Sequence, residues 1–233
     1  MKIRKILCSL LFVGVIGASL NANAVVLHSD APPDTIGVIS EVPFFLNADN
    51  FSLSADSSID KISWWGGYFD PFTGGYSDGT ALTDSFTVNI LDDSAGAPGA
   101  VINDISASGV VTRNTYDSVN NIYGYDLVLN SALDLSAGNY YLSVMNFEFS
   151  GWDWMFSQDL SDTSWYGEAD LIDPTIIHWS ETYFDPFIGQ DILNPGLAFA
   201  VYGTQAQVPV PPTLLLMLAP LVFLRWSRRR FNS

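Results

Sequence analysis

Short stretches in which apolar and polar residues alternate recur through the middle of the chain. The alternation has a period of two, which is typical of strands that bury one face, and its apolar positions are rich in aromatic and β-branched residues. The clearest stretches are residues 51–54, 61–64, 85–90, 125–129 and 140–144. Because no stretch between residues 25 and 207 has the period of a capped helix, the pattern predicts an all-β body.

Clusters of Gly, Pro, Asn, Asp and Ser separate these stretches, and such residues adopt the dihedral angles of tight turns. The clusters lie at residues 66–67, 73–75, 92–99, 120–121 and 136–139. Many short strands joined by such turns are typical of a β-sandwich or jelly roll. The sequence contains no charge run or Pro-Ser-rich linker that would divide the body. We expect residues 25–207 to form a single β-sandwich domain that is jelly-roll-like.

The first 24 residues have the composition of a secretory signal peptide. A basic start precedes an apolar stretch at residues 6–20, and Ala22 and Ala24 have the spacing of the small residues that precede a cleaved bond. We expect cleavage after Ala24, so that the mature chain begins at Val25. An uncleaved signal anchor is the alternative.

Residues 208–233 form a second targeting segment, in which an uncharged apolar stretch at residues 213–224 is expected to form a hydrophobic helix. The stretch follows a Pro-containing signature and precedes an Arg cluster, namely Val208, Pro209, Val210 and Pro211 on one side and Arg228, Arg229 and Arg230 on the other. A permanent membrane span needs about 20 apolar residues, so this helix is marginal. Segments rich in Arg stay on the cytoplasmic side, which would leave the body outside the cytoplasmic membrane.

This combination of signature, helix and Arg cluster resembles the PEP-CTERM sorting tail of Gram-negative bacteria. The commonest form of the signature has Glu at the third position, and residues 208–211 are closer to the Val-Pro-Leu-Pro-Ala variant. The resemblance implies recognition by an exosortase-type membrane protease. It also implies an inner-membrane intermediate that is later transferred to the cell surface or released. An ordinary C-terminal membrane anchor is the alternative.

Several phrases of the body are similar, in the same order, to exported bacterial proteins with a jelly-roll body ahead of such a tail. The phrases lie at residues 48–53, 62–68, 95–99 and 197–203. This resemblance implies the fold and no particular activity.

Charge is distributed unevenly along the chain. All 25 acidic residues lie between Asp30 and Asp191, whereas seven of the nine basic residues lie in the two targeting segments. Only Lys61 and Arg113 are left in the body, which therefore has a formal charge of −23. Since nucleic-acid binding requires Lys and Arg to neutralise phosphates, nucleic acid is excluded as a partner.

Tryptophans are the sharpest candidates for ligand contacts, because aromatic rings stack on the apolar C–H faces of sugars. Within a strand, Trp152 and Trp154 would share one face while Asp153 takes the other. The six tryptophans of the body are Trp64, Trp65, Trp152, Trp154, Trp165 and Trp179. We expect Trp165, with Tyr166, to lie in a polar loop and to be the best polysaccharide contact. The alternative is that the tryptophans fill the core.

One segment of the sequence occurs twice. Residues 68–74 read Tyr-Phe-Asp-Pro-Phe-Thr-Gly, and residues 183–189 read Tyr-Phe-Asp-Pro-Phe-Ile-Gly. One interpretation is that both segments meet and present Asp70 and Asp185 as a paired binding site. The other interpretation, which we favour, is that each is an independent turn after a strand, since Asp-Pro is common in turns.

Metal and catalytic motifs are weak. Calcium binding would need several oxygen ligands, and the available pairs are Asp92 with Asp93, Asp159 with Asp162, and Asp170 with Asp173. No set of metal ligands and no catalytic residue is predicted. We therefore expect a non-catalytic surface or matrix protein. A carbohydrate-binding module, with or without calcium, is the alternative, and a glycoside hydrolase with an unassigned carboxylate pair is a second alternative.

Overall fold

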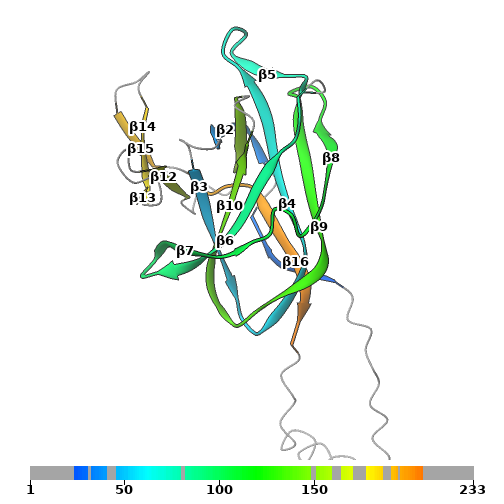
Figure 1. Ribbon diagram of the computed structural model, residues 1–233. Coiled ribbons are helices and arrows are strands. Elements are labelled where there is room, and N and C mark those ends of the chain that lie inside the picture. Colours follow the sequence, from blue (N-terminus) through cyan, green and yellow to red (C-terminus); the bar gives the residue numbers. More distant parts are fainter. Residues whose placement is uncertain are drawn as a thin grey trace, which may run out of the picture.

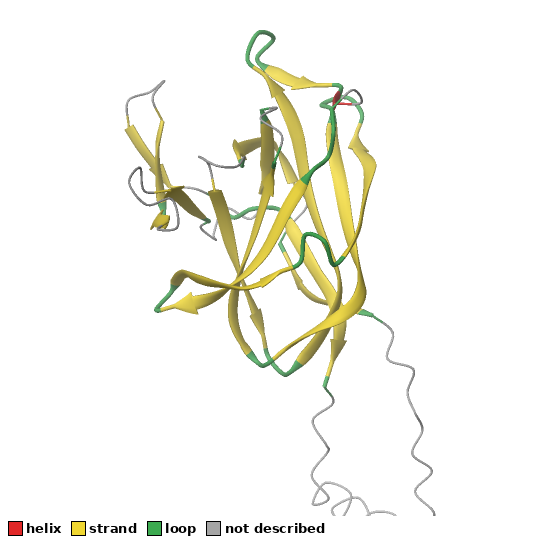
Figure 2. Cartoon of the chain, viewed as in Figure 1, coloured by secondary structure: helices red, strands yellow, loops and turns green. Residues whose placement is uncertain are grey.

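The structure is a computed structural model that describes residues 24–30, 33–40, 46–79, 82–147, 151–158, 164–169, 177–185, 190–193 and 195–206 (Figure 1). The described residues are almost entirely strands joined by short turns, and none of them forms an α-helix (Figure 2). The predicted all-β body is confirmed.

An eight-stranded antiparallel sheet forms one side of the body. Its main path runs β1 (Val25–Ser29), β16 (Phe199–Gln205), β4 (Ser57–Asp70), β11 (Trp152–Ser157) and β2 (Pro33–Ile39). The long strand β4 also pairs with β9 (Ile122–Leu135) and β5 (Gly75–Ser77), and β9 pairs with β8 (Gly109–Asp117). Because β4 pairs with four strands, it is the centre of this sheet.

A six-stranded antiparallel sheet forms the other side. Its order is β13 (Ile177–Ser180), β12 (Trp165–Ala169), β3 (Leu46–Leu53), β10 (Gly138–Asn146), β6 (Phe86–Ser94) and β7 (Ala97–Asp104). A separate hairpin pairs β14 (Thr182–Asp185) with β15 (Gln190–Leu193). The two curled sheets face each other as in a sandwich (Figure 1).

The main core lies between the two sheets and follows the alternation of the strands. Ile62 and Trp64 of β4 are fully buried, as are Leu142 and Val144 of β10. All four belong to one cluster of buried residues. The strands predicted at residues 51–54, 61–64, 85–90, 125–129 and 140–144 all coincide with observed strands, except that Ser54 and Ser85 lie just outside them.

Aromatic rings fill one end of this core. Trp64, Trp152 and Trp154 are fully buried, so the interpretation that tryptophans fill the core is correct for these three. The ring of Phe86 lies 5.0 Å from that of Trp152 and 5.2 Å from that of Trp64, both in edge contacts. Edge-to-face pairs of this kind contribute about 0.5–1.5 kcal/mol each beyond the area that they bury.

The predicted turn at Gly66 and Gly67 is wrong, because both residues lie inside β4. A Cβ atom on Gly66 would lie 2.3 Å from Cζ2 of Trp152, and one on Gly67 would lie 2.9 Å from the ring of Tyr76. These glycines therefore allow large rings to pack flat against the strand instead of turning the chain.

The other predicted turn clusters do contain turns, although strands extend into several of them. Ala95 and Gly96 connect β6 to β7 with positive φ angles of 58° and 88°. Two positive φ angles are typical of the tight hairpin turn that matches the twist of its strands. Asn121, with a φ of 55°, is the last residue of the turn between β8 and β9.

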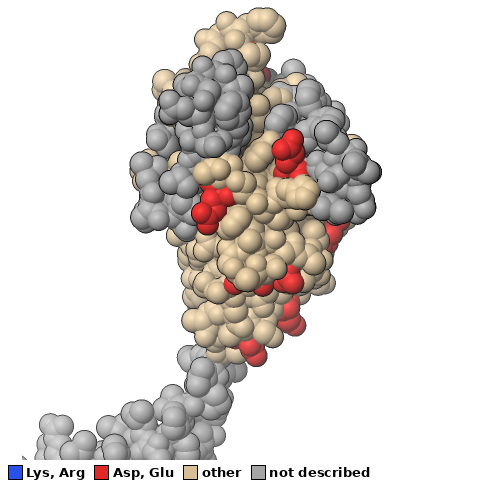
Figure 3. All heavy atoms as spheres, turned by 90° about the vertical axis from the view of Figure 1, so that its left-hand side faces the viewer, with Lys and Arg blue, Asp and Glu red and all other residues tan. Residues whose placement is uncertain are grey.

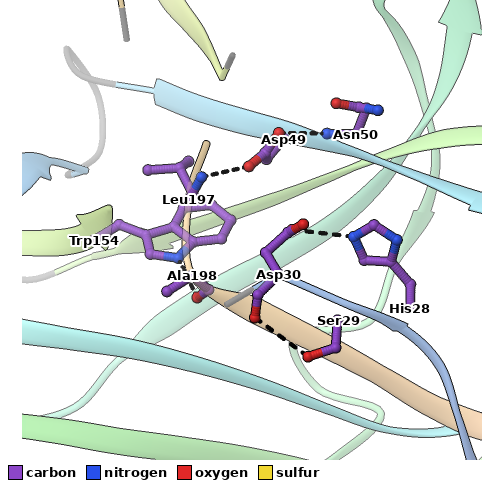
Figure 4. A network of polar contacts seen from close by, with 8 residues as sticks. All are labelled: His28, Ser29, Asp30, Asp49, Asn50, Trp154, Leu197 and Ala198. Carbon is purple, nitrogen blue, oxygen red and sulfur yellow. Dashed lines mark hydrogen bonds and ion pairs between the residues drawn. The ribbon is translucent and has the colours of Figure 1, made fainter. Parts of the chain in front are cut away.

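A buried carboxylate joins the two sheets (Figure 4). Asp49 of β3 is fully buried and accepts hydrogen bonds from the backbone N–H of Leu197 and, at 2.8 Å, of Asn50. Next to it, Nε1 of Trp154 donates to the carbonyl oxygen of Ala198 at 3.0 Å. The segment that leads into β16 is thus fixed from both sheets.

The first and last strands of the body are neighbours. β1 pairs with β16 in antiparallel register, with Val25 opposite Gly203. Both ends of the described body therefore lie at the same end of the molecule, at the bottom of Figure 1. We call this end the terminal pole.

No helix in the described part of the chain is long and apolar enough to cross a membrane. The predicted signal peptide at residues 1–24, apart from Ala24 itself, and the predicted tail at residues 208–233 lie outside the described residues.

Candidate functional site

A shallow trough of about 210 Å³ lies on the outer face of the eight-stranded sheet, over β8, β9, β4 and β16. These strands are on the right in Figure 1. Its side chains come from four strands and include Lys61, Ser63, Trp65, Asn114, Tyr116, Asp126 and Tyr202, with Gly124 in the floor. We call this feature the outer trough.

Strand alternation explains why these residues share a face. Ile62 and Trp64 point into the core, so the residues next to them in β4 point outward. The antiparallel register then places Trp65 opposite Gly124, and Ser63 opposite Asp126. The sheet itself thus brings these groups together.

The polar part of the outer trough is a linked set of side chains. Oδ1 of Asp126 accepts a hydrogen bond from Oγ of Ser63 at 2.5 Å and from Nζ of Lys61 at 3.3 Å. The same Nζ lies 4.0 Å from the centre of the Tyr202 ring, within the range of a cation–π interaction. Lys61 is therefore held between a carboxylate and an aromatic face.

The aromatic part lies at the other end of the outer trough. The rings of Trp65 and Tyr116 are 6.0 Å apart in an edge contact, and Tyr116 is 48 % exposed. A Cβ atom on Gly124 would lie 3.3 Å from Nε1 of Trp65, so glycine at this position leaves room beside the indole.

Arg113, the other basic residue of the body, has a structural role. Its guanidinium donates to the carbonyl oxygen of Gly79 at 3.1 Å and forms an ion pair with Asp84 at 3.3 Å. Asp84 also accepts from the hydroxyl of Tyr68 at 2.6 Å. Burial and this hydrogen bond raise the pKa of Tyr68 above its ordinary range, so the hydroxyl remains a donor. The cluster fixes the segment between β5 and β6 against β8.

The predicted loop at Trp165 and Tyr166 is wrong, because both residues belong to strand β12. β12 pairs with β3 on one side and with β13 on the other. Trp165 is half-buried and packs against a small apolar cluster of Ala48, Leu91 and Tyr141. Part of the Trp165 side chain is therefore used in packing, and its role as a ligand contact stays a prediction.

Each repeated segment begins in a strand that pairs with the next strand along the chain. Asp70 is opposite Gly75, and Asp185 is opposite Gln190. Oδ1 of Asp70 accepts from the N–H of Phe72 at 2.9 Å, which is the bond of an Asx turn. The hairpins belong to different sheets, and the side chain of Asp185 lies outside the described residues. For Asp70, the geometry agrees with the independent-turn interpretation.

The described residues contain no group of three or more His, Cys, Asp or Glu side chains that could hold a metal ion. On the side of the molecule in Figure 3, acidic side chains appear at several places and lie closer together in the lower half of the coloured region. Of the predicted calcium pairs, Asp92 and Asp93 lie in β6. The pairs Asp159 with Asp162 and Asp170 with Asp173 lie outside the described residues.

Most residues of the outer trough were missed by the sequence analysis. Trp65 was named only as one of the six tryptophans of the body. Tyr116 and Tyr202 were not named as candidates. A usable signal was present in β4, where Lys61, Ser63 and Trp65 alternate with apolar residues that face the core. Gly124, at a mid-strand position where glycine is unfavourable, was a second signal.

Comparison with known proteins adds nothing to this geometry, since no family model, no curated protein and no solved structure matches the chain.

Proposed function

We propose that this chain is an exported, exosortase-sorted β-sandwich that is displayed at the cell surface or in the extracellular matrix and has no catalytic role. The observation that carries the proposal is the pairing of β1 with β16, which places both ends of the body at the terminal pole. A tail held in the membrane would then fix this pole, and the rest of the body would project away from the membrane.

The limits of the folded body support this arrangement. β1 begins at Val25, directly after the proposed cleavage site at Ala24. β16 ends at Gln205, shortly before the proposed sorting signature at residues 208–211. In the sequence, both proposed targeting segments therefore lie directly before and after the strands that the structure describes. Among the described residues, the main core cluster extends from Val38 to Val201.

The strand order supports the jelly-roll-like form of the proposal. Strands that are distant in the sequence are neighbours in both sheets, as β3 lies between β10 and β12, and β4 lies between β9 and β16. Such non-sequential neighbours are typical of Greek-key connections, which jelly rolls contain.

The polar groups of the outer trough favour a non-catalytic role. Its described lining includes one carboxylate, Asp126, which is engaged by Lys61 and Ser63. Glycoside hydrolysis generally needs two carboxyl groups about 5–10 Å apart. The outer trough is therefore better suited to binding than to bond cleavage.

The sorting proposal is tested by changing the charge of the tail. Replacement of Arg228, Arg229 and Arg230 by Ser should reduce processing of the C-terminus and retention in the membrane, because the cationic cluster no longer holds the end in the cytoplasm. Replacement of the same residues by Lys keeps the charge and serves as the matched control. Processing is followed by the size of the protein in membrane and surface fractions of an exosortase-containing host.

Two results would contradict the proposal. One is normal maturation of the Ser variant, and the other is recovery of the intact, uncleaved chain from the cytosol of the native host.

A further inference from the structure

We propose that the outer trough is a binding site for a neutral polysaccharide, in which one sugar ring lies against Trp65 and Tyr116 and the chain continues past Asp126, with which it forms hydrogen bonds, toward Tyr202. This proposal concerns the folded body and does not depend on how the tail is processed.

Aromatic side chains gather on the outer face of the sheet at the outer trough. The outer face of an antiparallel sheet is normally polar, because its inner face supplies the core. Here three aromatic side chains from three strands, β4, β8 and β16, line one hollow on that outer face. Trp65 and Tyr202 are only half-buried, and Tyr116 is 48 % exposed. Aromatic rings that remain exposed around a hollow are suited to the apolar C–H faces of a sugar ring.

Hydrogen-bonding groups that remain available lie beside these aromatic side chains in the outer trough. The contacts of Asp126 within the described residues use Oδ1, which leaves Oδ2 available as an acceptor. About a third of the side chains of Asp126 and Lys61 remains exposed, 34 % and 32 % respectively. Asn114 is exposed at the rim and offers both a donor and an acceptor. Aromatic surface beside carboxylate and amide groups matches a molecule with apolar faces and hydroxyl edges.

Charge and size select the class of sugar. Lys61 is neutralised by Asp126, and the body around them has a formal charge of −23. An anionic glycan would be repelled by this surface, so the proposed ligand is neutral. The volume of about 210 Å³ is below the range of about 300–1,000 Å³ typical of sites for drug-sized ligands. The outer trough therefore fits one ring of a longer chain that continues across the sheet.

Gly124 explains how the hollow stays open. A glycine in mid-strand is less favourable than alanine by roughly 0.5–1 kcal/mol. Any side chain at position 124 would project into the floor and against Trp65. A larger residue should therefore block the site while every aromatic residue stays in place.

The test uses the full chain, purified in a detergent without a sugar headgroup. It is applied to an array of neutral oligosaccharides of glucose, galactose, mannose and xylose, with uronic-acid oligosaccharides as the anionic comparison. The affinity for the best neutral oligosaccharide is then measured by calorimetry. Trp65→Ala and Gly124→Val should each weaken binding by about tenfold or more, a loss comparable to that of a central contact residue.

The matched control is Phe72→Ala. Phe72 is an aromatic residue in the turn after β4, is 97 % exposed and lies outside the outer trough. This variant should bind like the unchanged protein. Thermal melting of each variant shows whether the variant still folds. Tyr116→Ala changes a trough residue at an exposed position, so it should have little effect on stability.

Three results would overturn the proposal. The first is no binding to any neutral oligosaccharide, and the second is binding to the uronic-acid oligosaccharides alone. The third is equal weakening by Phe72→Ala and by the folded trough variants.

Discussion

At the scale of single residues, the buried carboxylate of Asp49 has a clear structural role. Asp49 is fully buried, and its carboxylate accepts backbone N–H groups from β3 and from the segment that leads into β16. A buried donor that loses its acceptor retains the full cost of its removal from water. Asp49 should therefore contribute more to stability than any acidic residue on the surface.

Asp49→Ala should lower the free energy of unfolding by about 1–3 kcal/mol, because the N–H of Leu197 loses its partner in a buried place. Chemical denaturation of the full chain measures this loss. Asp117→Ala is the matched control, since Asp117 accepts from the N–H groups of Val119 and Asn120 at the surface. Water replaces the acceptor there, so the loss should be smaller. Equal losses in both variants would contradict the structural role of Asp49.

The choice between exposed and buried tryptophans also belongs to this scale. Alternation indicates that Trp64 and Trp65 face opposite sides of a strand, but it does not indicate which side is the core. That choice depends on the long-range pairing of β4 with β9 and β16, which local sequence does not reveal. Trp165 was misplaced for the same reason, since its pairing partner β3 is more than a hundred residues away.

At the scale of elements, the strands with clear alternation were predicted well, whereas Gly66 and Gly67 were wrongly assigned to a turn and Trp165 and Tyr166 to a loop. Period-two patterns are local, so residues 61–64 and 140–144 could be assigned without knowledge of the fold. Gly66 and Gly67 have the composition of a turn, but their role is set by Trp152 and Tyr76, which come from other strands. A glycine that provides space and a glycine that turns the chain look alike in a single sequence.

Gly66→Ala should destabilise the protein by about 1–3 kcal/mol, the usual cost of overpacking a core. The added methyl group would overlap the indole of Trp152, which is fully buried and has little room to move. Gly75→Ala is the control, because no atom lies within 4 Å of the added Cβ. Its effect should stay within about 0.5 kcal/mol. Denaturation midpoints that are equal for the two variants would show that the contact with Trp152 is not tight.

At the scale of the whole molecule, charge is the dominant feature. The body has 25 acidic residues and only two basic ones. Both basic residues form ion pairs, Lys61 with Asp126 and Arg113 with Asp84. A net charge this far from zero favours solubility and creates repulsion within the folded state. The fold tolerates this repulsion because a large apolar core lies between two extended sheets.

The melting temperature should rise by a few degrees when sodium chloride is increased from about 10 mM to about 150 mM. The Debye length falls over this range from about 30 Å to about 8 Å, which screens repulsion between separate carboxylates. Calcium and magnesium at equal ionic strength should give the same melting temperature if the carboxylates act only as screened charges. A larger rise with calcium would contradict this expectation and would indicate a specific calcium site.

The pairing of β1 with β16 also affects the order in which the eight-stranded sheet forms. Within the described residues β1 pairs with β16 alone, so it gains its partner strand only when residues 199–205, near the end of the body, reach it. Contacts between residues so distant in sequence form slowly, because the intervening chain must first be gathered. The eight-stranded sheet can thus be completed only after nearly the whole body has been synthesised. Until then its first strand lacks its partner strand, and the edge of the sheet that β16 will occupy stays open.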